Sequence, residues 1–328
     1  MASLTELTSF EDSSREMRAR FQQDVLAGLS QERKAIPARY FYDRQGSELF
    51  EEITSLPEYY PTRAECEILR QCCGEIAEDI GPGWAVIEFG AGSAAKTPLL
   101  LDCIDPSSYV PIDISGDFLT ESCNGLTRRY PQIPIFPVVA DFTRPVTIPT
   151  ELASHDRLGF FPGSTIGNFE PRAAVALLAS MRNTLGDRSL LLIGMDMIKD
   201  PEILVAAYDD AAGVTARFNL NLAARVNREI DGTVPLDALR HRAIWNQQRD
   251  RVEMHLEATR DIGFHVSGCY FTMATGETIH TENSHKYDER SANLLLRSAG
   301  WEPHGHYFDA ARRFMVILAR AEPTRVTP

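Results

Sequence analysis

Residues 84–96 read WAVIEFGAGSAAK, and this stretch decides the fold. Its first half, Ala85 to Phe89, is a short apolar run of the kind that fills a buried parallel strand. Its second half, Gly90 to Ser93, is a turn of small residues, and the chain after Lys96 is typical of an opening helix. A strand, a glycine turn and a helix in this order direct backbone N–H groups toward a nucleotide. Glycine is needed there because a Cβ would block the close approach of a ligand to the chain.

An acidic residue stands at the spacing that nucleotide-binding sheets of this kind require. Asp113 follows Gly92 by 21 positions and ends a second apolar run, residues 109–112. In such folds an acid at this place accepts hydrogen bonds from ribose hydroxyls. A glycine pair alone also occurs in purely structural turns, so the nucleotide site is predicted from the strand context and Asp113 together.

The composition is that of a globular protein and excludes two classes of partner. The chain has 328 residues, of which 44% are hydrophobic and 24% charged, enough for one large domain or two ordinary ones. Its formal net charge of −13 repels nucleic acid and anionic lipid, so we expect neither as a partner. No apolar run approaches membrane-spanning length, and the N-terminus lacks the pattern of a signal peptide. We therefore expect a cytoplasmic protein.

Cysteine and histidine give no sign of a metal site. The six cysteines are Cys66, Cys72, Cys73, Cys103, Cys123 and Cys269. They show no C-x-x-C pair and no regular spacing, so we expect reduced thiols that mostly fill the core. His280 and His285 are close in sequence, but no Cys or Glu stands beside them at a zinc-ligand spacing. We expect no metal.

The chain before the glycine turn is expected to be largely helical. Met17, Phe21, Val25 and Leu29 recur at four-residue steps, which predicts an amphipathic helix over residues 11–30. The aromatic residues that follow, Tyr40 to Tyr42, suit core packing and a ligand wall equally.

A second helix is expected beyond two prolines. The prolines that bracket residues 57–61 exclude a helix interior there. Thr62, with Glu65 three residues later, predicts a capping box at the start of a helix that runs to about Ile80.

From residue 84 onward, strand and helix patterns alternate. We expect strands at 84–89, 108–113, 133–140, 157–162 and 189–196, and helices at 95–103, 115–129 and 170–185. This alternation predicts an α/β fold with a parallel, doubly wound, Rossmann-type sheet. Ligands of such sheets bind outside the carboxyl ends of the strands. The residues expected there are Gly90, Gly92, Asp113, Asp141, Phe142, residues 163–168 and Asp196.

The pattern changes after Asp196. Residues 201–227 are expected to be helical, and residues 251–286 alternate as strands that do not continue the βαβ rhythm. We therefore expect a second, α+β lobe. A helix over 289–300 and a final strand over 314–319 are expected to return the chain to the first sheet, and the tail from residue 322 is expected to fray.

The glycine turn alone does not identify the nucleotide. Gly90, Gly92 and Ala95 fit a dinucleotide fingerprint as well as an S-adenosylmethionine site. Three features favour the latter by fold analogy: the absence of a second mononucleotide unit, the acid-aromatic pair at Asp141 and Phe142, and a closing strand that follows a helix.

Longer motifs resemble the ergothioneine-pathway histidine Nα-methyltransferases. They are LPEYYPTR (56–63), EFGAGS (88–93) with Lys96, PID (111–113), GSTIGN (163–168), AYDDAAGVT (207–215) and T-E-x-S (281–284). The resemblance covers about residues 17–319. It implies an enzyme that moves up to three methyl groups from S-adenosylmethionine to the α-amine of L-histidine, giving Nα,Nα,Nα-trimethylhistidine (hercynine) in ergothioneine biosynthesis. The alternatives are a methyltransferase of the same fold that acts on another amino acid or amine, and a nucleotide-binding protein without turnover.

The resemblance also implies a division of the chain and of the site. It implies a Rossmann-type methyltransferase domain of residues 63–198 plus 289–328, and an α+β substrate-binding domain of residues 1–62 plus 199–288. The residues implied for S-adenosylmethionine are Tyr59, Gly90, Gly92, Ser93, Lys96, Asp113, Asp141, Phe142, Gly163 and Ser164. Those implied for L-histidine and its mono- and dimethyl forms are Tyr42, Tyr59, Asn168, Tyr208, Met254, Glu282 and Ser284, with Tyr42 also catalytic.

Within that set, the resemblance gives each substrate residue a role. It implies that Tyr42 and Tyr59 line the amine, and that Asn168 and Tyr208 hold the carboxylate. It also implies that Met254 packs on the imidazole ring, whose nitrogens bond to Glu282 and Ser284. From the residues alone, Glu282 and Ser284 equally suit an exposed edge strand, Asn168 a turn, and Tyr208 the core.

The spacing of Glu282 and Ser284 gives the physical argument for histidine. Residues two apart on a strand face the same side. A carboxylate accepts an N–H from one ring nitrogen, and a hydroxyl serves the other as donor or acceptor. An apolar substrate would leave both groups buried and unpaired, at about 1–3 kcal/mol each. The reaction needs a neutral amine rather than an enzyme nucleophile, so we expect no Ser-His-Asp or Cys-His arrangement.

Overall fold

The computed structural model describes residues 4–322 and divides them into two compact units. Unit 1 comprises the described residues up to Ile53, together with Leu204–Asn246 and Val252–Asn283. Unit 2 comprises Thr54–Ile203, Gln247–Arg251 and the described residues from Ser284 onward.

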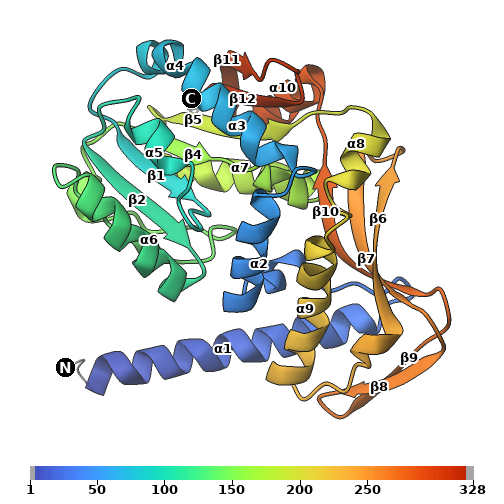
Figure 1. The fold of residues 1–328 in the computed structure, drawn as a ribbon. Helices are drawn as coiled ribbons and strands as arrows, with labels where there is room; N and C mark the ends of the chain where they lie inside the picture. The colour runs from blue at the N-terminus through green and yellow to red at the C-terminus, as the bar shows by residue number, and fades with distance from the viewer. Residues whose placement is uncertain (1–3, 323–328) are drawn as a thin grey trace, which may run out of the picture. The chain divides into compact units, whose positions relative to one another are not determined.

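Unit 2 is built on a seven-stranded sheet with the order β11-β12-β5-β4-β1-β2-β3 (Figure 1). The strands are β1 (Ala85–Phe89), β2 (Ser108–Asp113), β3 (Val138–Val139), β4 (Arg157–Phe161), β5 (Leu190–Asp196), β11 (Trp301–Phe308) and β12 (Phe314–Ala321). Strands β3, β2, β1, β4 and β5 are parallel, whereas β12 pairs antiparallel with β5, and β11 with β12. The doubly wound sheet and its closing strand are confirmed.

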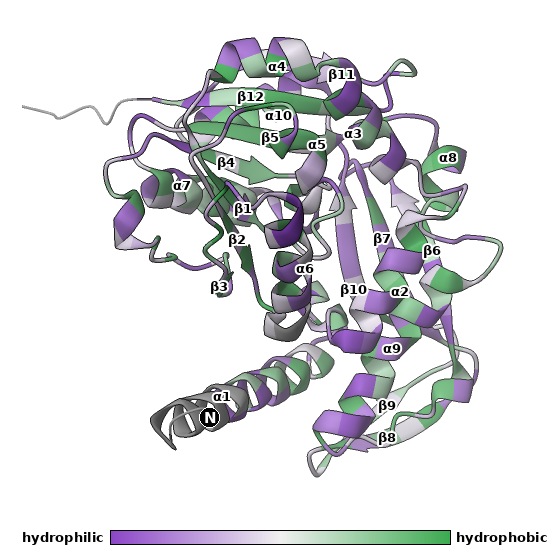
Figure 2. Ribbon diagram, turned by 60° about the vertical axis from the view of Figure 1, so that its left-hand side comes forward, coloured by the Kyte–Doolittle hydropathy of each residue, from purple (hydrophilic) through white to green (hydrophobic). Residues whose placement is uncertain are grey.

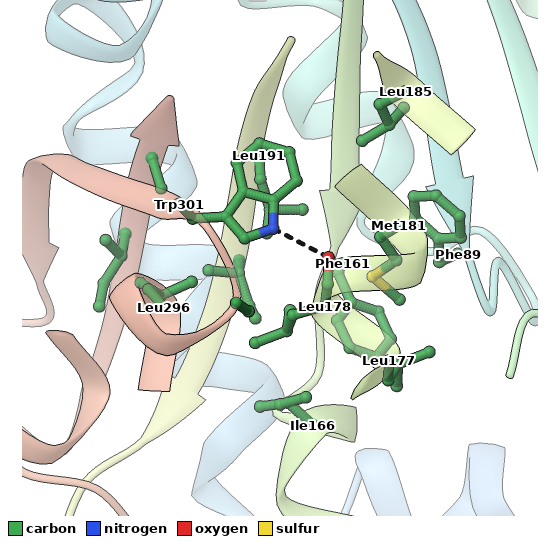
Figure 3. Packing of buried hydrophobic residues seen from close by; sticks show 14 of the residues in the cluster. Phe89, Phe161, Ile166, Leu177, Leu178, Met181, Leu185, Leu191, Leu296 and Trp301 are labelled. Carbon is green, nitrogen blue, oxygen red and sulfur yellow. Dashed lines mark hydrogen bonds between the residues drawn. The ribbon is translucent and has the colours of Figure 1, made fainter. Parts of the chain in front are cut away.

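Helices cover the sheet because alternate strand residues supply two cores. Ala85, Ile87 and Phe89 belong to one buried cluster, which includes residues of α7 and α10, and Val86 belongs to another, which includes α3 and α4. In Figure 2 the strands of this sheet are mostly hydrophobic, as expected for strands buried on both faces. Trp301 closes the first core by donating its indole N–H to the Leu178 carbonyl at 2.9 Å (Figure 3).

The helices of unit 2 follow the expected pattern with local differences. They are α3 (Tyr60–Gln71), α4 (Cys73–Ile80), α5 (Thr97–Leu101), α6 (Gly116–Arg129), α7 (Pro171–Leu185) and α10 (Glu289–Ser298), with short 3-10 turns η2 (Thr150–Leu152) and η3 (Thr165–Asn168). The strand expected at 133–140 is reduced to the two residues of β3, because Pro134 and Pro137 cannot donate to a ladder. Strand β11 was not predicted.

The predicted capping box is wrong. Helix α3 begins at Tyr60, two residues before Thr62, because Pro61 suits the first turn of a helix and takes the chain into it early. Glu65 is fully buried inside the helix rather than at its N3 position. The expected single helix is also interrupted at Cys72, where α3 ends and α4 begins.

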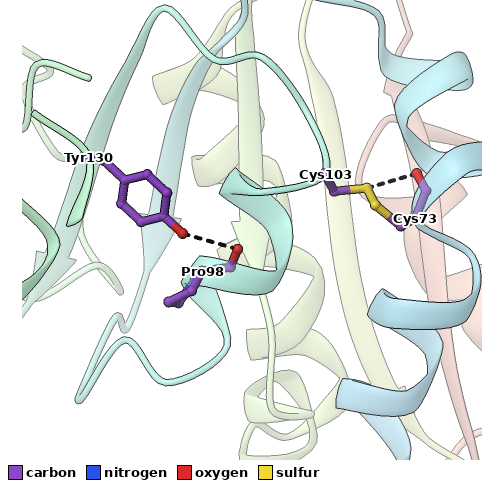
Figure 4. The surroundings of a disulfide bond; sticks show 4 residues. All are labelled: Cys73, Pro98, Cys103 and Tyr130. Carbon is purple, nitrogen blue, oxygen red and sulfur yellow. Dashed lines mark hydrogen bonds between the residues drawn. A yellow bond between two sulfur atoms is a disulfide. The ribbon is translucent and has the colours of Figure 1, made fainter. Parts of the chain in front are cut away.

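The expectation that all six cysteines are reduced is wrong for two of them. Cys73, at the start of α4, and Cys103, just beyond α5, form a disulfide with a Cα–Cα distance of 5.5 Å (Figure 4). The other four cysteines are free. The pair is 30 residues apart in sequence and follows no motif spacing, so only the packing of α4 against the α5 end reveals it.

Unit 1 combines helices with two small sheets. Its main elements are α1 (Leu4–Leu29), η1 (Ala38–Phe41), α2 (Arg44–Thr54), α9 (Val214–Glu229), η4 (Leu236–Ala238), β6 (Leu239–Asn246), β7 (Arg251–Ala258), β8 (Ile262–Val266), β9 (Cys269–Met273) and β10 (Thr278–His285). The terminal residues Thr54, Arg251, Ser284 and His285 of these elements belong to unit 2. The sheet orders are β10-β7-β6 and β8-β9. Phe21, Val25 and Leu29 of α1 are buried as predicted, but Met17 is 52% exposed.

The helix expected over 201–227 is in fact two. Helix α8 (Pro201–Ala206) ends before a loop at residues 207–213, and α9 starts after Gly213. Asp210 fixes that start, because its carboxylate accepts from the backbone N–H of Val214 at 2.9 Å and of Thr215 at 2.7 Å. These two bonds fix the end of the loop that carries Tyr208.

Candidate active site

The glycine turn after β1 is held against the end of β2. Gly90 and Gly92 both have positive φ, +75° and +53°, as a turn that only glycine enters readily requires. The N–H groups of Gly90 and Ala91 both donate to the Ile112 carbonyl, at 2.8 and 3.1 Å. A Cβ at Gly90 would lie 3.2 Å from the ring of Phe142. Phe142 therefore lies close beside the turn.

Asp113 stands at the end of β2 and is tied to the same turn. Its Oδ2 accepts from the Gly92 N–H at 2.9 Å, and its Oδ1 accepts from the Ser115 N–H at 2.9 Å. A carboxylate has about four acceptor positions. These two bonds fix the orientation of Asp113 while leaving it capacity for hydroxyl donors of a ligand.

The remaining predicted cofactor residues belong to unit 2, and most of them follow its strands. Asp141 and Phe142 follow β3, where Asp141 accepts from the Thr143 N–H at 3.0 Å and Phe142 packs edge-on against Phe161. Gly163 and Ser164 follow β4, and Tyr59 precedes α3. Ser93 lies in the glycine turn itself. The prediction that Gly90, Gly92, Asp113, Asp141, Phe142 and residues 163–168 lie at or follow the carboxyl ends of the strands is confirmed, while the binding roles of these residues, of Ser93 and of Tyr59 stay predictions.

Sequence reasoning missed the role of Glu65. Its carboxylate accepts from the Gly163 N–H at 2.9 and 3.1 Å and pairs with the Lys96 ammonium at 2.6 Å. Glu65 is fully buried, and the Lys96 side chain is 15% exposed. Glu65 therefore joins the start of α5 to the loop after β4. The charge inside an otherwise apolar helix face was the signal in the sequence.

A second buried acid, Glu88, lies within β1. It accepts from the Thr97 hydroxyl at 2.6 Å and from the Tyr109 hydroxyl at 2.7 Å. Burial raises the pKa of Glu88 to about 7, against the two hydrogen bonds, which lower it. The three side chains link β1, β2 and the first residue of α5, and so brace both sides of the glycine turn.

The loop after β4 is a strained turn that presents Asn168. Gly163 and Ser164 both have positive φ, and the 3-10 turn η3 that follows ends at Asn168. The Ser164 hydroxyl accepts from the Asp196 N–H at 2.9 Å. A Cβ at Gly167 would lie 2.8 Å from the His285 carbonyl. The contacts of Ser164 and Gly167 therefore hold the turn that carries Asn168.

A buried ionic cluster lies at the end of β5. Asp196 accepts from the Tyr60 hydroxyl at 2.7 Å and pairs with Lys286 at 2.7 Å and with Lys199 at 2.6 Å. Burial alone would raise the pKa of Asp196, but the two ammonium groups outweigh it and lower that pKa. Burial lowers the pKa of Lys199 to about 8.

Lys286 also reaches Ser284. Its ammonium donates to the Ser284 hydroxyl oxygen at 2.8 Å, and both residues are buried. The sequence placed Asp196 at the rim of the sheet, but no pattern in it pointed to Lys286.

In unit 1, Tyr208 is held through its backbone by two polar residues. The side-chain amide nitrogen of Asn219 lies 2.8 Å from His241 Nδ1, and His241 Nε2 lies 2.7 Å from the Tyr208 carbonyl. Because the amide donates and the carbonyl accepts, His241 is neutral with its hydrogen on Nε2. Burial lowers the pKa of His241, which agrees with this assignment.

The other predicted substrate residues of unit 1 come from three elements. Tyr42 follows η1 and packs edge-on against Phe50 and Phe218, with ring centroids 5.8 and 6.0 Å away. Met254 on β7 is buried, and its carbonyl accepts from the Thr281 hydroxyl at 3.0 Å. Glu282, the next residue of β10, is 8% exposed. Its burial removes the alternative that Glu282 is a solvated edge residue.

Neither a metal-binding cluster nor a membrane-spanning helix occurs among the residues that the structure describes. No group of three or more His, Cys, Asp or Glu residues within 4–322 is arranged to hold a metal ion. Among the helices of the same residues, none has the length and apolar character needed to cross a membrane.

Comparison with known proteins identifies a family. A family model described as "Histidine-specific methyltransferase, SAM-dependent" matches residues 21–321. The chain is 38% identical over 304 residues to the "Histidine N-alpha-methyltransferase" of Mycolicibacterium smegmatis, covering 91% of this chain and 94% of that protein. The corresponding protein of Mycobacterium tuberculosis is 37% identical over 305 residues, with the same coverage.

A fungal relative matches over part of its length. "Ergothioneine biosynthesis protein 1" of Neurospora crassa is 29% identical over 293 residues, which span 82% of this chain and 31% of that protein. The extent of the family match and the two full-length relatives agree with the strand-end geometry of unit 2. The chain belongs to the SAM-dependent, histidine-specific methyltransferases.

Proposed function

We propose that the protein transfers up to three methyl groups from S-adenosylmethionine to the α-amine of L-histidine. The products would be the mono- and dimethyl forms and then Nα,Nα,Nα-trimethylhistidine (hercynine), in ergothioneine biosynthesis. The observation that carries the proposal is the family match across residues 21–321, with relatives named for Nα-methylation of histidine at 38 and 37% identity.

Two features of unit 2 support the binding of S-adenosylmethionine there. A Cβ at Gly90 would lie only 3.2 Å from the Phe142 ring, and Asp113 is oriented but retains acceptor capacity. We propose that the cofactor is held by Tyr59, Gly90, Gly92, Ser93, Lys96, Asp113, Asp141, Phe142, Gly163 and Ser164. When bound, S-adenosylmethionine supplies a methyl group that its sulfonium already activates.

In this proposal Lys96 acts with its partner Glu65. Because the ammonium pairs with Glu65 at 2.6 Å, Lys96 meets the ligand as half of a neutral pair rather than as an isolated cation. The same Glu65 holds the Gly163 N–H, so Lys96 and the loop after β4 are positioned together.

The protein's own task is to bind histidine with a neutral amine. A free α-amine has a pKa of about 8, so only a minority of it is neutral at pH 7. We propose that Tyr42 and Tyr59 line the amine, that Tyr42 assists its deprotonation, and that Asn168 and Tyr208 hold the carboxylate. Correct alignment of a neutral amine with the methyl group is sufficient for the transfer, without an enzyme nucleophile.

Recognition of the ring is assigned to Met254, Glu282 and Ser284. Glu282 and Ser284 are buried polar residues two positions apart on one strand, so their side chains face the same side. A carboxylate accepts from a ring N–H and a hydroxyl bonds to a second ring nitrogen, whereas an indole ring offers one nitrogen and a phenyl ring none. Met254, buried on the neighbouring strand β7, provides an apolar surface for the ring.

A competition assay tests this function. The protein is incubated with S-adenosylmethionine and an equimolar mixture of the twenty amino acids, and the products are followed by mass spectrometry. We expect histidine alone to gain one, two and three methyl groups in sequence. Methylation of another amino acid in preference to histidine would contradict the proposal, and Glu282→Ala is expected to abolish the preference for histidine.

A further inference from the structure

A buried histidine of unit 1, His241 on β6, is hydrogen-bonded to the loop at residues 207–213. We propose that His241 is a positioning residue: it fixes the backbone of Tyr208, and so sets how tightly the Tyr208 side chain binds the substrate carboxylate. This inference rests on the proposed role of Tyr208 and deepens it, because it names a residue that controls carboxylate recognition through Tyr208.

The orientation of the Asn219 amide follows from its two partners. Asn219 Nδ2 lies 3.0 Å from the His255 carbonyl oxygen and 2.8 Å from His241 Nδ1. A carbonyl oxygen only accepts, so the amide atom that faces it is the nitrogen, which has two hydrogens to donate. One hydrogen goes to each partner. His241 Nδ1 is therefore an acceptor and carries no hydrogen.

The ring of His241 must then donate from its other nitrogen. A neutral imidazole whose Nδ1 accepts carries its hydrogen on Nε2, and Nε2 lies 2.7 Å from the Tyr208 carbonyl oxygen. Burial lowers the pKa of His241, whose side chain is 2% exposed, and this favours the neutral ring. The carboxylates of Asp209 and Asp210 act on that pKa in the opposite direction. The hydrogen bonds therefore run in one direction, from Asn219 through His241 to Tyr208.

This series joins Tyr208 to regular elements of unit 1. Asn219 is a fully buried residue of α9, His241 belongs to β6, and His255 belongs to β7. The Tyr208 N–H donates to the Val205 carbonyl at 2.9 Å. Both polar backbone groups of Tyr208 are therefore bonded, one of them to a side chain that α9 holds in place.

The loop is fixed at its far end by a separate contact, the cap that Asp210 places on α9. His241 therefore adds a second side-chain anchor, at the residue that bears the phenol. Groups that bind a substrate must be held within about 0.5 Å of the productive geometry. Release of the Tyr208 carbonyl is thus expected to weaken the grip on the carboxylate while the methyl transfer step itself is little affected.

Steady-state kinetics with paired variants separate positioning from a loss of stability. His241→Phe keeps a flat ring that neither donates nor accepts, and is expected to raise KM for histidine about tenfold, equivalent to about 1.4 kcal/mol. Its kcat should change by no more than about threefold, because binding rather than chemistry is impaired. Tyr208→Phe should have a similar effect, and the double variant should be no worse than Tyr208→Phe alone. His241→Gln keeps one donor and one acceptor on a neutral amide, and should restore most of the loss.

Asn227→Leu is the matched control. Asn227 also joins α9 to a neighbouring segment of unit 1, because it donates to the Val234 carbonyl at 2.9 Å and accepts from the Val234 N–H at 2.7 Å. The variant should lose stability but keep its KM for histidine within about twofold of the unaltered value. Multiplicative losses in the His241 and Tyr208 double variant, or an equal rise in KM for Asn227→Leu, would overturn the proposal.

An independent measurement uses the unaltered protein, so it does not depend on whether His241→Phe folds. The protein is labelled with ¹⁵N in its histidine rings, and His241 is identified as the ring whose signals are lost in His241→Gln. Near neutral pH we expect a lone-pair Nδ1 and a protonated Nε2. The opposite tautomer, or two protonated nitrogens, would overturn the inference.

The outcomes also distinguish this inference from the proposed function. If the unaltered protein does not methylate histidine, the proposed function itself fails. Normal turnover by the unaltered protein, with an unchanged KM in a folded His241→Phe variant, would overturn the role of His241 alone.

Discussion

Glu88→Gln offers a quantitative test of how β1 is braced. The carboxyl of Glu88 is fully buried and accepts from Thr97 and Tyr109. Burial raises its pKa from 4.5 to about 7 in the folded protein. At about 1.4 kcal/mol for each tenfold change in proton affinity, this difference is worth about 3 kcal/mol of stability between the protonated and ionised states.

The sign follows from proton linkage. Because the folded protein holds this proton more tightly than the unfolded chain, the stabilisation is fully present below pH 4.5 and is lost as the pH rises through about 7. Gln keeps an accepting oxygen of the same shape but does not ionise. Between pH 5 and pH 7.5 the unaltered protein should therefore lose about 2 kcal/mol relative to Glu88→Gln.

Urea unfolding of both proteins at four pH values over this range measures the difference directly. We expect the unfolding free energies to diverge in favour of the variant as the pH rises. Parallel curves, or a divergence of the opposite sign, would refute the assignment of a buried, protonated Glu88.

Three further changes test other contacts. Gly90→Ala should raise KM for S-adenosylmethionine about tenfold or more, equivalent to about 1.4 kcal/mol, because φ is +75° and the new Cβ would lie 3.2 Å from Phe142. Gly125→Ala is the control, because a Cβ there meets nothing within 4 Å. Equal KM values for the two variants would contradict the account. Glu65→Ala should cost about 3 kcal/mol of stability, because it leaves Lys96 and the Gly163 N–H without their buried partner. Glu65→Gln should cost less, and urea unfolding measures both. An unchanged unfolding free energy for Glu65→Ala would show that the Glu65–Lys96 pair does not stabilise the fold. Cys103→Ser should lower stability by about 3–4 kcal/mol, since it opens a loop closed across 30 residues. If the variant and the unaltered protein have the same melting temperature under both oxidising and reducing conditions, the result counts against the disulfide.

The sheet was predictable because its strands are short apolar runs separated by amphipathic helices. Such runs suit burial on both faces, and strands 84–89 and 189–196 of the prediction coincide closely with β1 and β5. Strand β3 departed from expectation where Pro134 and Pro137 remove ladder donors, a signal that was present but outweighed by the apolar pattern.

The positions at the strand ends were predictable for a related reason. Parallel strands end at one edge, so Gly90, Asp113 and Gly163 had to meet there. The supporting contacts were not predictable, because they join residues far apart in sequence. Glu65 reaches the Gly163 N–H across 98 positions, and no local pattern encodes that pairing.

The same limit applies to the residues that we propose bind the ring. The alternation of β10 put Glu282 and Ser284 on one side of a strand, but whether that side is buried depends on packing. The pairing of Lys286 with Asp196 depends on β5 and the end of β10 being brought together, which only the folded structure reveals.

The most direct test of the central claim locates the transferred methyl group. The protein is supplied with histidine and with S-adenosylmethionine carrying a ¹³C-labelled methyl, and the product is examined by two-dimensional NMR. The account predicts up to three labelled methyl groups, all attached to the α-nitrogen. Label on a ring nitrogen, or no labelled histidine under conditions in which S-adenosylmethionine binds, would contradict it.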